Sequence, residues 1–370
     1  MTKPNWLKSS YLRASLSQMI ARRLTESADN RTTQNNVLIH STDGLGDAIL
    51  RLTTVSALVA KHGKEHTWVL TRAHALGLYE KLGIKTILYT DRDRVSPIAR
   101  TKLVKGLRAK QFGIAYVLDF SLNENLLDLL EIPEKYGFVQ LCAHAKPRTI
   151  ELTEPIVHPG YVGDALRNFC EAARISPSIM DNRVLLNRGE KNSSDSTKKQ
   201  MKIGLAVGAS NLGKMMRVCN LAQIFYEITR AYPSSEIVLL GAGSRDEKYV
   251  SLVEKQFGSG PYELHNVQVS NKVSLLSVSD LIDEVQTLDL LVGFDSALYN
   301  LAFTLRIPTI CMSYGDASVL HDYPWVRVVR GNGNPFGQPD QYGNRHTNSI
   351  THEEVIQAIN DLNEVNSLLE

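Results

Sequence analysis

Short apolar segments alternate with longer helical patterns along most of this chain, and the alternation stops once and then restarts. The first block runs from residue 36 to residue 130, and the second from 202 to 312. In each block, strand-like runs such as Val37 to His40 precede helix-like runs such as Asp47 to Lys61. This alternation is typical of a parallel sheet with helices on both faces. The pattern therefore predicts an α/β protein with two such sheets.

A polar, charged run with almost no apolar content separates the two blocks and is the expected interdomain linker. At 370 residues the chain is too long for one ordinary core, in agreement with two domains. A final helix is expected after Thr351, with Glu354 as its capping-box partner. The expected segments are a helical extension with its linker (1–35), an N-terminal Rossmann-like domain (36–187), the linker (188–200), a C-terminal Rossmann-like domain (201–350) and the last helix (351–370).

The charge and cysteine content of the chain argue against several classes of protein and of binding site. Lys and Arg total 41 and Asp and Glu total 39, so the dense basic face of a dedicated nucleic-acid binder is not expected. The chain has 4 cysteines, none in a close pair, which argues against a zinc site or a disulfide framework. A reducing, cytoplasmic compartment fits this cysteine usage. We read no signal peptide and no membrane-spanning run in the sequence.

The N-terminal segment from Trp6 to Leu24 has apolar residues at helical spacing together with basic residues and no acidic ones. Its expected apolar face consists of Leu7, Tyr11, Leu12, Leu16, Ile20 and Leu24. Such a helix can lie on an anionic bilayer, so peripheral membrane contact through residues 1–24 is one interpretation. Packing against protein is the other, and we favour it because most amphipathic helices bury one face in this way.

Two turns follow predicted strands and contain glycine. Gly208 to Met215 nearly matches the P-loop signature, but Met215 lacks the hydroxyl that would hold magnesium, so a P-loop NTPase is not expected. Gly208 and Gly213 would still let backbone N–H groups approach an anion, with Ser210 and Lys214 beside them. An ordinary strand–turn–helix connection is the alternative.

Ser41 to Asp47 forms the other turn, with glycines at Gly44 and Gly46. Asp47 lies at the first helical turn after it, where a carboxylate is either a helix cap or a general base. From this segment alone the cap is favoured. Asp295 and Ser296 likewise end a predicted strand and open a helix, as an N-cap pair or as a site for a phosphate and a sugar hydroxyl.

Three stretches together resemble glycosyltransferase family 9, the lipopolysaccharide heptosyltransferase-like enzymes. They are VLIHSTDGLGDAIL (37–50), IGLAVGASNLGKMMRVCNLAQI (203–224) and LDLLVGFDSALYNLAFTLRIPTICMSYG (288–315). The resemblance covers roughly residues 36–330 and the last helix. It implies a GT-B fold of two facing Rossmann-like domains, with the acceptor bound by the first and a nucleotide sugar by the second. It also implies an inverting reaction that needs no metal or other cofactor, usually with ADP-heptose as donor.

The resemblance assigns roles to single residues. Asp47 matches the aspartate proposed as general base. Ser210, Lys214, Ser296 and Ala297 match contacts to the donor diphosphate, and Asp295 and Asn300 match contacts to the donor sugar. Asp246 or Glu247 lies where a carboxylate often binds ribose hydroxyls. The implied partners are a nucleotide sugar and an acceptor that is a surface glycan, a glycolipid such as the lipopolysaccharide core, or a protein.

This sequence also departs from the family pattern. Ala297 stands in place of a glycine and Asn300 in place of a histidine, so the charge that a histidine could carry near the leaving group is absent. Met215 and Met216 replace the usual aromatic residue after the lysine. A binding protein without catalysis that keeps the same fold is therefore the alternative function.

Overall fold

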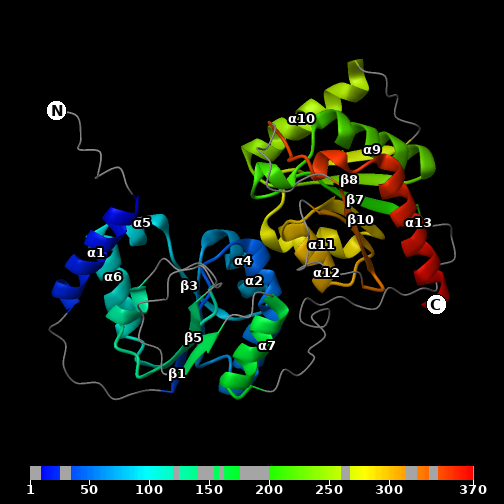
Figure 1. The fold of residues 1–370 in the computed structure, drawn as a ribbon. Helices are drawn as coiled ribbons and strands as arrows, with labels where there is room; N and C mark the ends of the chain where they lie inside the picture. The colour runs from blue at the N-terminus through cyan, green and yellow to red at the C-terminus, as the bar shows by residue number, and fades with distance from the viewer. Residues whose placement is uncertain are drawn as a thin grey trace, which may run out of the picture. The chain divides into compact units, whose positions relative to one another are not determined.

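In the computed structural model the chain divides into two compact units, unit 1 (Met1–Met180) and unit 2 (Asp181–Glu370). The structure describes residues 10–25, 35–119, 125–140, 154–157, 162–175, 200–259, 267–313, 323–332 and 341–369. Most of the expected linker at 188–200 lies outside the described residues. Figure 1 shows the helices and strands of each unit.

Unit 1 contains a six-stranded sheet in the order β3-β2-β1-β4-β5-β6, and every pairing in it is parallel. Its strands are β1 (Asn36–His40), β2 (Thr67–Thr71), β3 (Lys85–Leu88), β4 (Phe112–Val117), β5 (Glu134–Gln140) and β6 (Glu154–Val157). Its helices are α1 (Ser10–Thr25), α2 (Leu45–Leu50), α3 (Leu52–His62), α4 (Ala73–Lys81), α5 (Asp91–Val95), α6 (Pro97–Arg108), the 3-10 turn η2 (Asn125–Leu129) and α7 (Val162–Ala172).

Unit 2 repeats this topology with a six-stranded parallel sheet in the order β12-β11-β10-β7-β8-β9. Its strands are β7 (Lys202–Ala206), β8 (Glu236–Leu240), β9 (Gln268–Asn271), β10 (Leu290–Phe294), β11 (Thr309–Ser313) and β12 (Val326–Arg330). Its helical elements are η3 (Leu212–Lys214), α9 (Val218–Ala231), α10 (Ser244–Ser259), α11 (Val278–Thr287), α12 (Ala297–Thr304), η4 (Thr347–Ser349) and α13 (His352–Leu369).

The strand order locates the expected ligand edge of each sheet. In both sheets the chain moves outward from the first strand, then returns and continues on its other side. The direction reverses between β1 and β4 in unit 1 and between β7 and β10 in unit 2. In open α/β sheets, ligands bind outside the carboxyl ends of the strands at this switch point. Two equivalent positions, one in each unit, are therefore available.

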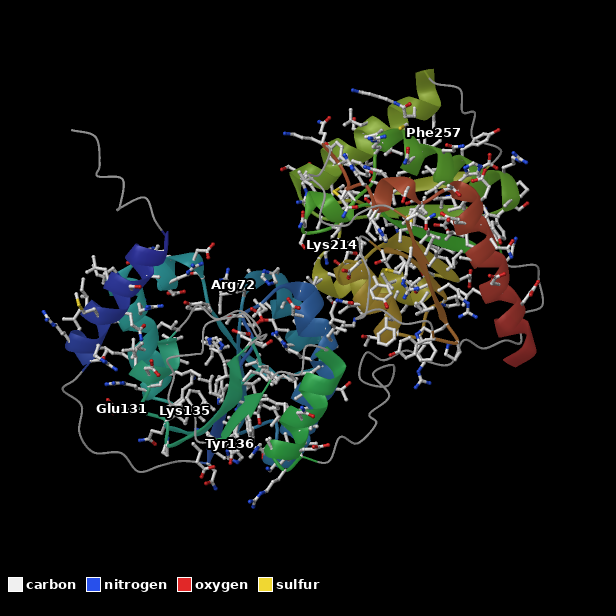
Figure 2. The ribbon with its side chains drawn as sticks, in the orientation of Figure 1. Arg72, Glu131, Lys135, Tyr136, Lys214 and Phe257 are labelled. Atoms are coloured by element: carbon white, nitrogen blue, oxygen red, sulfur yellow. The ribbon has the colours of Figure 1, made fainter. Side chains whose placement is uncertain are left out.

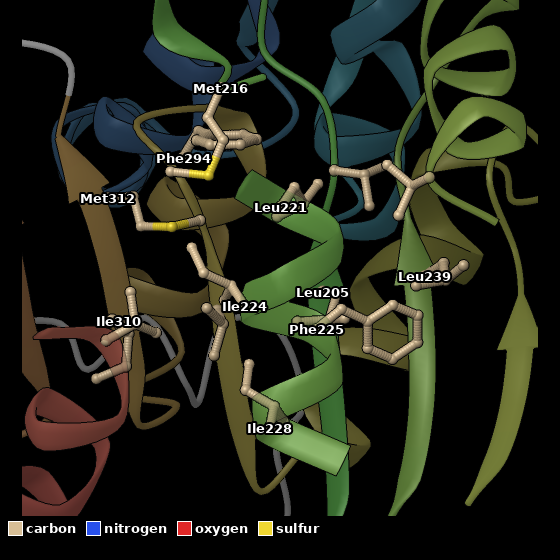
Figure 3. Packing of buried hydrophobic residues seen from close by; sticks show 14 of the residues in the cluster. Leu205, Met216, Leu221, Ile224, Phe225, Ile228, Leu239, Phe294, Ile310 and Met312 are labelled. Atoms are coloured by element: carbon tan, nitrogen blue, oxygen red, sulfur yellow. The ribbon is translucent and has the colours of Figure 1, made fainter. Parts of the chain in front are cut away.

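The central strands are apolar and almost fully buried, as parallel strands with helices on both faces must be. In unit 2 the helix α9 lies across the sheet, with Ile224, Phe225 and Ile228 near the side chains of Leu205 and Ile310 (Figure 3). Met215 and Met216, which replace the family's aromatic residue, are fully buried in the same core. They pack below the turn rather than presenting a surface to a ligand.

The helix α1 lies beside α6 (Figure 1) and buries a different face from the one expected. The buried residues are Ala14, Ser17, Ala21 and Thr25, whereas the side chains of Leu16 and Leu24 from the expected apolar face are exposed. Small residues permit close approach to α6. They also leave the backbone carbonyls of Ala14 and Thr25 accessible to arginines of α6. Packing against protein is confirmed, whereas the prediction is wrong for Leu16 and Leu24; Ile20 is half-buried, and Leu7 lies outside the described residues.

Other elements differ from the sequence expectation in ways that matter for the site. The predicted helix from Asp47 to Lys61 is two consecutive helices that meet at Arg51. The first begins at Leu45, so Gly46 lies inside the helix rather than in the turn. The predicted strand from Ile114 to Asp119 ends at Val117, which places Asp119 in the loop at the carboxyl end of the strand.

The capping box at the last helix is confirmed. The Thr351 N–H donates to the Glu354 carboxylate at 2.9 Å, and the Glu354 N–H donates to the Thr351 hydroxyl at 3.3 Å. Within the described residues, no helix is both long enough and apolar enough to cross a membrane.

Candidate active site

Asp47 lies in the first turn of α2, next to the carboxyl end of β1 and therefore at the switch point of unit 1. Burial raises the pKa of its carboxyl above the ordinary value of 3.8, and the negative charges of Asp43 and Asp119 act in the same direction. Arg51 and a hydrogen bond from the Gly44 backbone N–H oppose the rise. Asp47 thus caps the start of α2 and is also a carboxylate with a raised pKa, as a general base requires.

A buried ionic network fixes the turn that carries Asp47. Asp119 accepts hydrogen bonds at 2.6 Å from both the backbone N–H and the hydroxyl of Thr42, and it lies 2.7 Å from Nδ1 of His40. Arg51, which is fully buried, pairs with Asp43 at 2.6 Å and with Asp119 at 3.3 Å. The network ties β1, β4 and the start of α3 together directly beneath the turn.

Burial acts on the pKa of Asp119 in one direction, and its charged and hydrogen-bonding neighbours act in the other. Burial alone would raise the pKa of its carboxyl, but His40, Arg51 and the Thr42 hydroxyl together hold it well below its usual range. The carboxylate therefore stays ionised. Next to this network, the Ser41 hydroxyl lies 2.9 Å from the Tyr79 hydroxyl, and burial raises the pKa of Tyr79 to about 12.

The switch point of unit 2 brings together residues 81 positions apart in the sequence. The ammonium of Lys214, which follows β7, contacts the carboxylate of Asp295, which follows β10, at 2.6 Å (Lys214 is labelled in Figure 2). Both side chains are about one-fifth exposed.

Ser296 is the N-cap residue of α12, with extended backbone and no capping bond from its side chain. Its buried hydroxyl has no hydrogen-bond partner among the described residues. Ala297 opens α12, and Asn300 lies one turn further along, with its N–H bonded to the carbonyl of Ser296. Backbone N–H groups, an unengaged hydroxyl and a cation therefore converge at a helix N-terminus, an arrangement that suits a phosphate.

Asp246, one of two expected ribose ligands, is used inside the protein. Its side chain is 5% exposed and accepts a hydrogen bond from the Ala242 N–H at 2.9 Å. A Cβ placed on Gly208 would lie 1.9 Å from its Oδ2 atom, so glycine at 208 makes room for this carboxylate. Glu247 is exposed on the first turn of α10.

The remaining expected donor contacts lie in the turn between β7 and α9. Ser210 is exposed, whereas the Gly213 N–H is occupied by the side chain of Asn211 at 2.9 Å. Arg245 reaches this turn from α10 and donates to the carbonyls of Ala209 and, at 3.1 Å, Ser210. It adds a second cation to the turn.

The geometry agrees with what the chain resembles. The family model described as glycosyltransferase family 9 (heptosyltransferase) matches residues 100–347 of the 370. This chain belongs to glycosyltransferase family 9. No curated protein sequence matches it significantly.

Solved structures show the same fold at low sequence identity. E. coli ADP-heptose lipopolysaccharide heptosyltransferase II has a TM-score of 0.65 and 17% identity, and the match covers 90% of this chain and 100% of that one. E. coli heptosyltransferase WaaC with ADP-2-deoxy-2-fluoro heptose has a TM-score of 0.63 and 15% identity, over 88% and 99%. A family 9 glycosyltransferase of Veillonella parvula has a TM-score of 0.60 and 15% identity, over 89% and 97%. These likenesses establish the GT-B fold.

Two parts of the candidate site were not predicted from the sequence. One is the network of His40, Asp43, Arg51 and Asp119 beneath the Asp47 turn, and the other is Arg245 at the donor turn. Asp119 could have been noticed because it is a carboxylate at the last position of a predicted strand. Arg51 carried no signal, because an arginine in a helix is ordinarily exposed.

Among the residues that the structure describes, no group of three or more His, Cys, Asp or Glu side chains is placed to hold a metal ion.

Proposed function

We propose that this protein is an inverting glycosyltransferase that moves heptose from ADP-heptose to a hydroxyl of a bacterial surface glycan or of a lipopolysaccharide core. The observation that carries the proposal is the Lys214–Asp295 pair at the unit 2 switch point, beside the N-terminus of α12. Membership of family 9 gives the class of reaction. The donor is inferred from heptosyltransferases of similar fold, one of which is an ADP-heptose enzyme and another of which was solved with ADP and with a fluorinated ADP-heptose.

In the proposed reaction, the acceptor oxygen attacks the anomeric carbon and its proton passes to the carboxylate of Asp47. The raised pKa makes Asp47 a stronger base than an exposed aspartate, and the positive charge of Arg51 limits how far the pKa rises. Asp119, Thr42 and Arg51 act as positioning residues, because they fix the turn and contact neither sugar nor acceptor in this scheme.

The bond between the anomeric carbon and the diphosphate breaks as the new bond forms, and ADP leaves with the electron pair. Lys214 and the hydroxyls of Ser210 and Ser296 are proposed to stabilise the negative charge on ADP, together with the backbone N–H of Ala297. No metal is needed in this scheme. Asp295 and Asn300 would hold sugar hydroxyls, and Asn300 does so without charge.

For the ribose we retain only Glu247 as a proposed ligand, because the carboxylate of Asp246 is engaged beneath Gly208. We place the reaction in the cytoplasm, where unpaired cysteines persist. A lipid-borne acceptor would bring it to a membrane surface.

Calorimetric titration with ADP, UDP, GDP and CMP tests the donor site in wild type and Lys214→Ala. Arg230→Ala is the matched control, because Arg230 is an exposed cation of α9 that pairs with Glu227 on the same helix. We expect selective ADP binding that is lost in Lys214→Ala and kept in the control. Selectivity for another nucleotide would overturn the ADP donor. Failure to bind any of the four would refute the donor site.

A transfer assay with ADP-heptose and lipopolysaccharide-core acceptor tests the catalytic role of Asp47. Asp47→Asn should bind ADP like the wild type and lose about 10²- to 10⁴-fold in rate, the usual contribution of a general base. Nucleotide binding without transfer in the wild type, across all donors tried, would favour the non-catalytic alternative.

A further inference from the structure

The two helices α1 and α6 carry an unusual charge. Over 16 and 12 residues they hold three and four basic side chains, respectively, and no acidic ones, in a chain whose total charge is nearly balanced. The basic residues are Arg13, Arg22, Arg23, Arg100, Lys102, Lys105 and Arg108.

Two of these arginines hold the helices together. Arg100 is 2% exposed and donates to the carbonyl of Ala14 at 3.2 Å and to the Gln18 side chain at 2.7 Å. Arg108 donates to the carbonyl of Thr25 and pairs with Glu131 at 2.7 Å. Contacts near both ends of α1 fix it firmly on α6, so its outward face is a defined surface.

The exposed positions of α1 and α6 include both cations and large apolar side chains. Arg22 and Arg23 on α1, and Lys102 and Lys105 on α6, are exposed. So are Leu16, Met19 and Leu24 on α1 and Ile98 on α6, with exposed fractions from 40% to 80%. These are four of the nine exposed large hydrophobic residues in the described part of the chain.

The sequence of α1 explains why the large side chains point outward. Among the side chains of α1 that the structure describes, the buried ones are Ala14, Ser17, Ala21 and Thr25, so small residues make the packed face while Leu16, Met19 and Leu24 are exposed to solvent. Exposed apolar surface of this kind is unfavourable in water, by about 25 cal/mol per Å². A partner with an apolar layer beneath a negatively charged surface would cover both kinds of side chain.

We propose that the outward face of α1 and α6 docks on a phospholipid bilayer that carries anionic headgroups. Leu16, Met19 and Leu24 enter the interfacial region, and the neighbouring cations contact lipid phosphates. A second copy of the chain is a poorer occupant, because it would bring Arg22 and Arg23 against an equally basic face. The inference rests on the proposed function only in that a lipid-borne acceptor would meet the enzyme there.

Vesicle co-sedimentation of the full chain tests the surface without any transfer assay. The probes are phosphatidylcholine vesicles and vesicles that also contain phosphatidylglycerol, at low and high salt. We expect binding to the anionic vesicles alone, weakened by salt. Arg22→Gln with Arg23→Gln should weaken it roughly thirtyfold, since each basic residue near the surface contributes about 1 kcal/mol. Leu16→Ser with Met19→Ser should also weaken it.

The controls are Arg230→Gln and Leu275→Ser, which change an exposed cation and an exposed leucine of unit 2. ADP binding measured on every variant shows that the donor site is folded, so a failed docking surface is distinguishable from a failed donor site. Equal binding to both vesicle types, no binding to either, or full binding by the double arginine variant would overturn the proposal. A dimer that dissociates in Leu16→Ser with Met19→Ser would show a second copy as the occupant and also overturn it.

Discussion

Gly208 and Asp246 lie so close that a methyl group on Gly208 has no room, and this contact makes a quantitative prediction. The Cβ of Gly208→Ala would lie 1.9 Å from Oδ2 of Asp246, whereas an ordinary contact begins at 3.4 Å. The carboxylate cannot move away without cost, because it is buried and holds the Ala242 N–H at 2.9 Å.

Two free-energy costs determine how strongly Gly208→Ala should destabilise the protein. Overpacking costs about 1–3 kcal/mol, and loss of a hydrogen bond to a charged group costs about 1.5–3 kcal/mol. Gly208→Ala should therefore destabilise unit 2 by about 2.5–6 kcal/mol. Asp246→Ala removes the hydrogen bond but also the obstacle, so its cost should be about 1.5–3 kcal/mol. The double variant should cost no more than Asp246→Ala alone.

Hydrogen exchange of the slowest amides in β7 and β8 measures this stability in unit 2 of the intact chain. Gly106→Ala is the control, because the Cβ it adds in α6 meets nothing within 4 Å. It should be neutral or stabilise its helix by up to about 1 kcal/mol. If the costs of Gly208→Ala and Asp246→Ala add in the double variant, the clash is not what requires glycine at 208, and the reasoning is refuted.

Because the pKa of Asp47 is raised, the rate of sugar transfer should increase with pH in the acid range above pH 3.8. Over the same range, the contribution of Asp47 to the free energy of unfolding should fall. Asp47→Asn should abolish both effects, as measured by pH–rate profiles and by denaturation at several pH values. In urea titrations, Arg51→Met should lower the free energy of unfolding by about 3–5 kcal/mol, because it leaves the carboxylates of Asp43 and Asp119 without their buried cation. The control Arg230→Met should change the free energy of unfolding by less than about 0.5 kcal/mol. The phenol of Tyr79 should ionise near pH 12 rather than 10, seen as the ultraviolet difference between wild type and Tyr79→Phe, with stability lost as pH rises between these values.

The alternation of strands and helices was enough to predict two parallel α/β sheets, because the central strands are continuous apolar runs, and the family resemblance added the GT-B fold. The strands that the sequence did not reveal are β5, β6, β9 and β12. The edge strand β9 shows the reason, since its four residues are mostly exposed and polar, and only pairing with β8 makes them a strand. Tertiary context rather than local pattern decides such segments.

The donor turn, Asp47 and Asp295 could be located from the sequence because each follows a predicted strand. Their surroundings could not. Asp119 reaches Thr42 across 77 positions, and Arg51 is buried although it lies at a helical position. Buried ion pairs between distant residues leave no periodic signal. Asp246 was assigned to the ribose from its place after β8, whereas its burial beneath Gly208 appears only in three dimensions.

Lys214 pairs with Asp295 in the structure, so under the proposed function the carboxylate of Asp295 competes with the donor diphosphate for Lys214. Under the proposed function, a diphosphate has to draw Lys214 away from Asp295, and an intact donor compensates by offering sugar hydroxyls to the released carboxylate. ADP alone lacks the transferred sugar and therefore offers none of its hydroxyls to Asp295. The recognition of phosphate and of sugar is then thermodynamically linked, so the whole donor is held more tightly than the spent nucleotide. In this scheme the pair re-forms after transfer and displaces ADP, so product release depends on two side chains that meet at the carboxyl edge of one sheet.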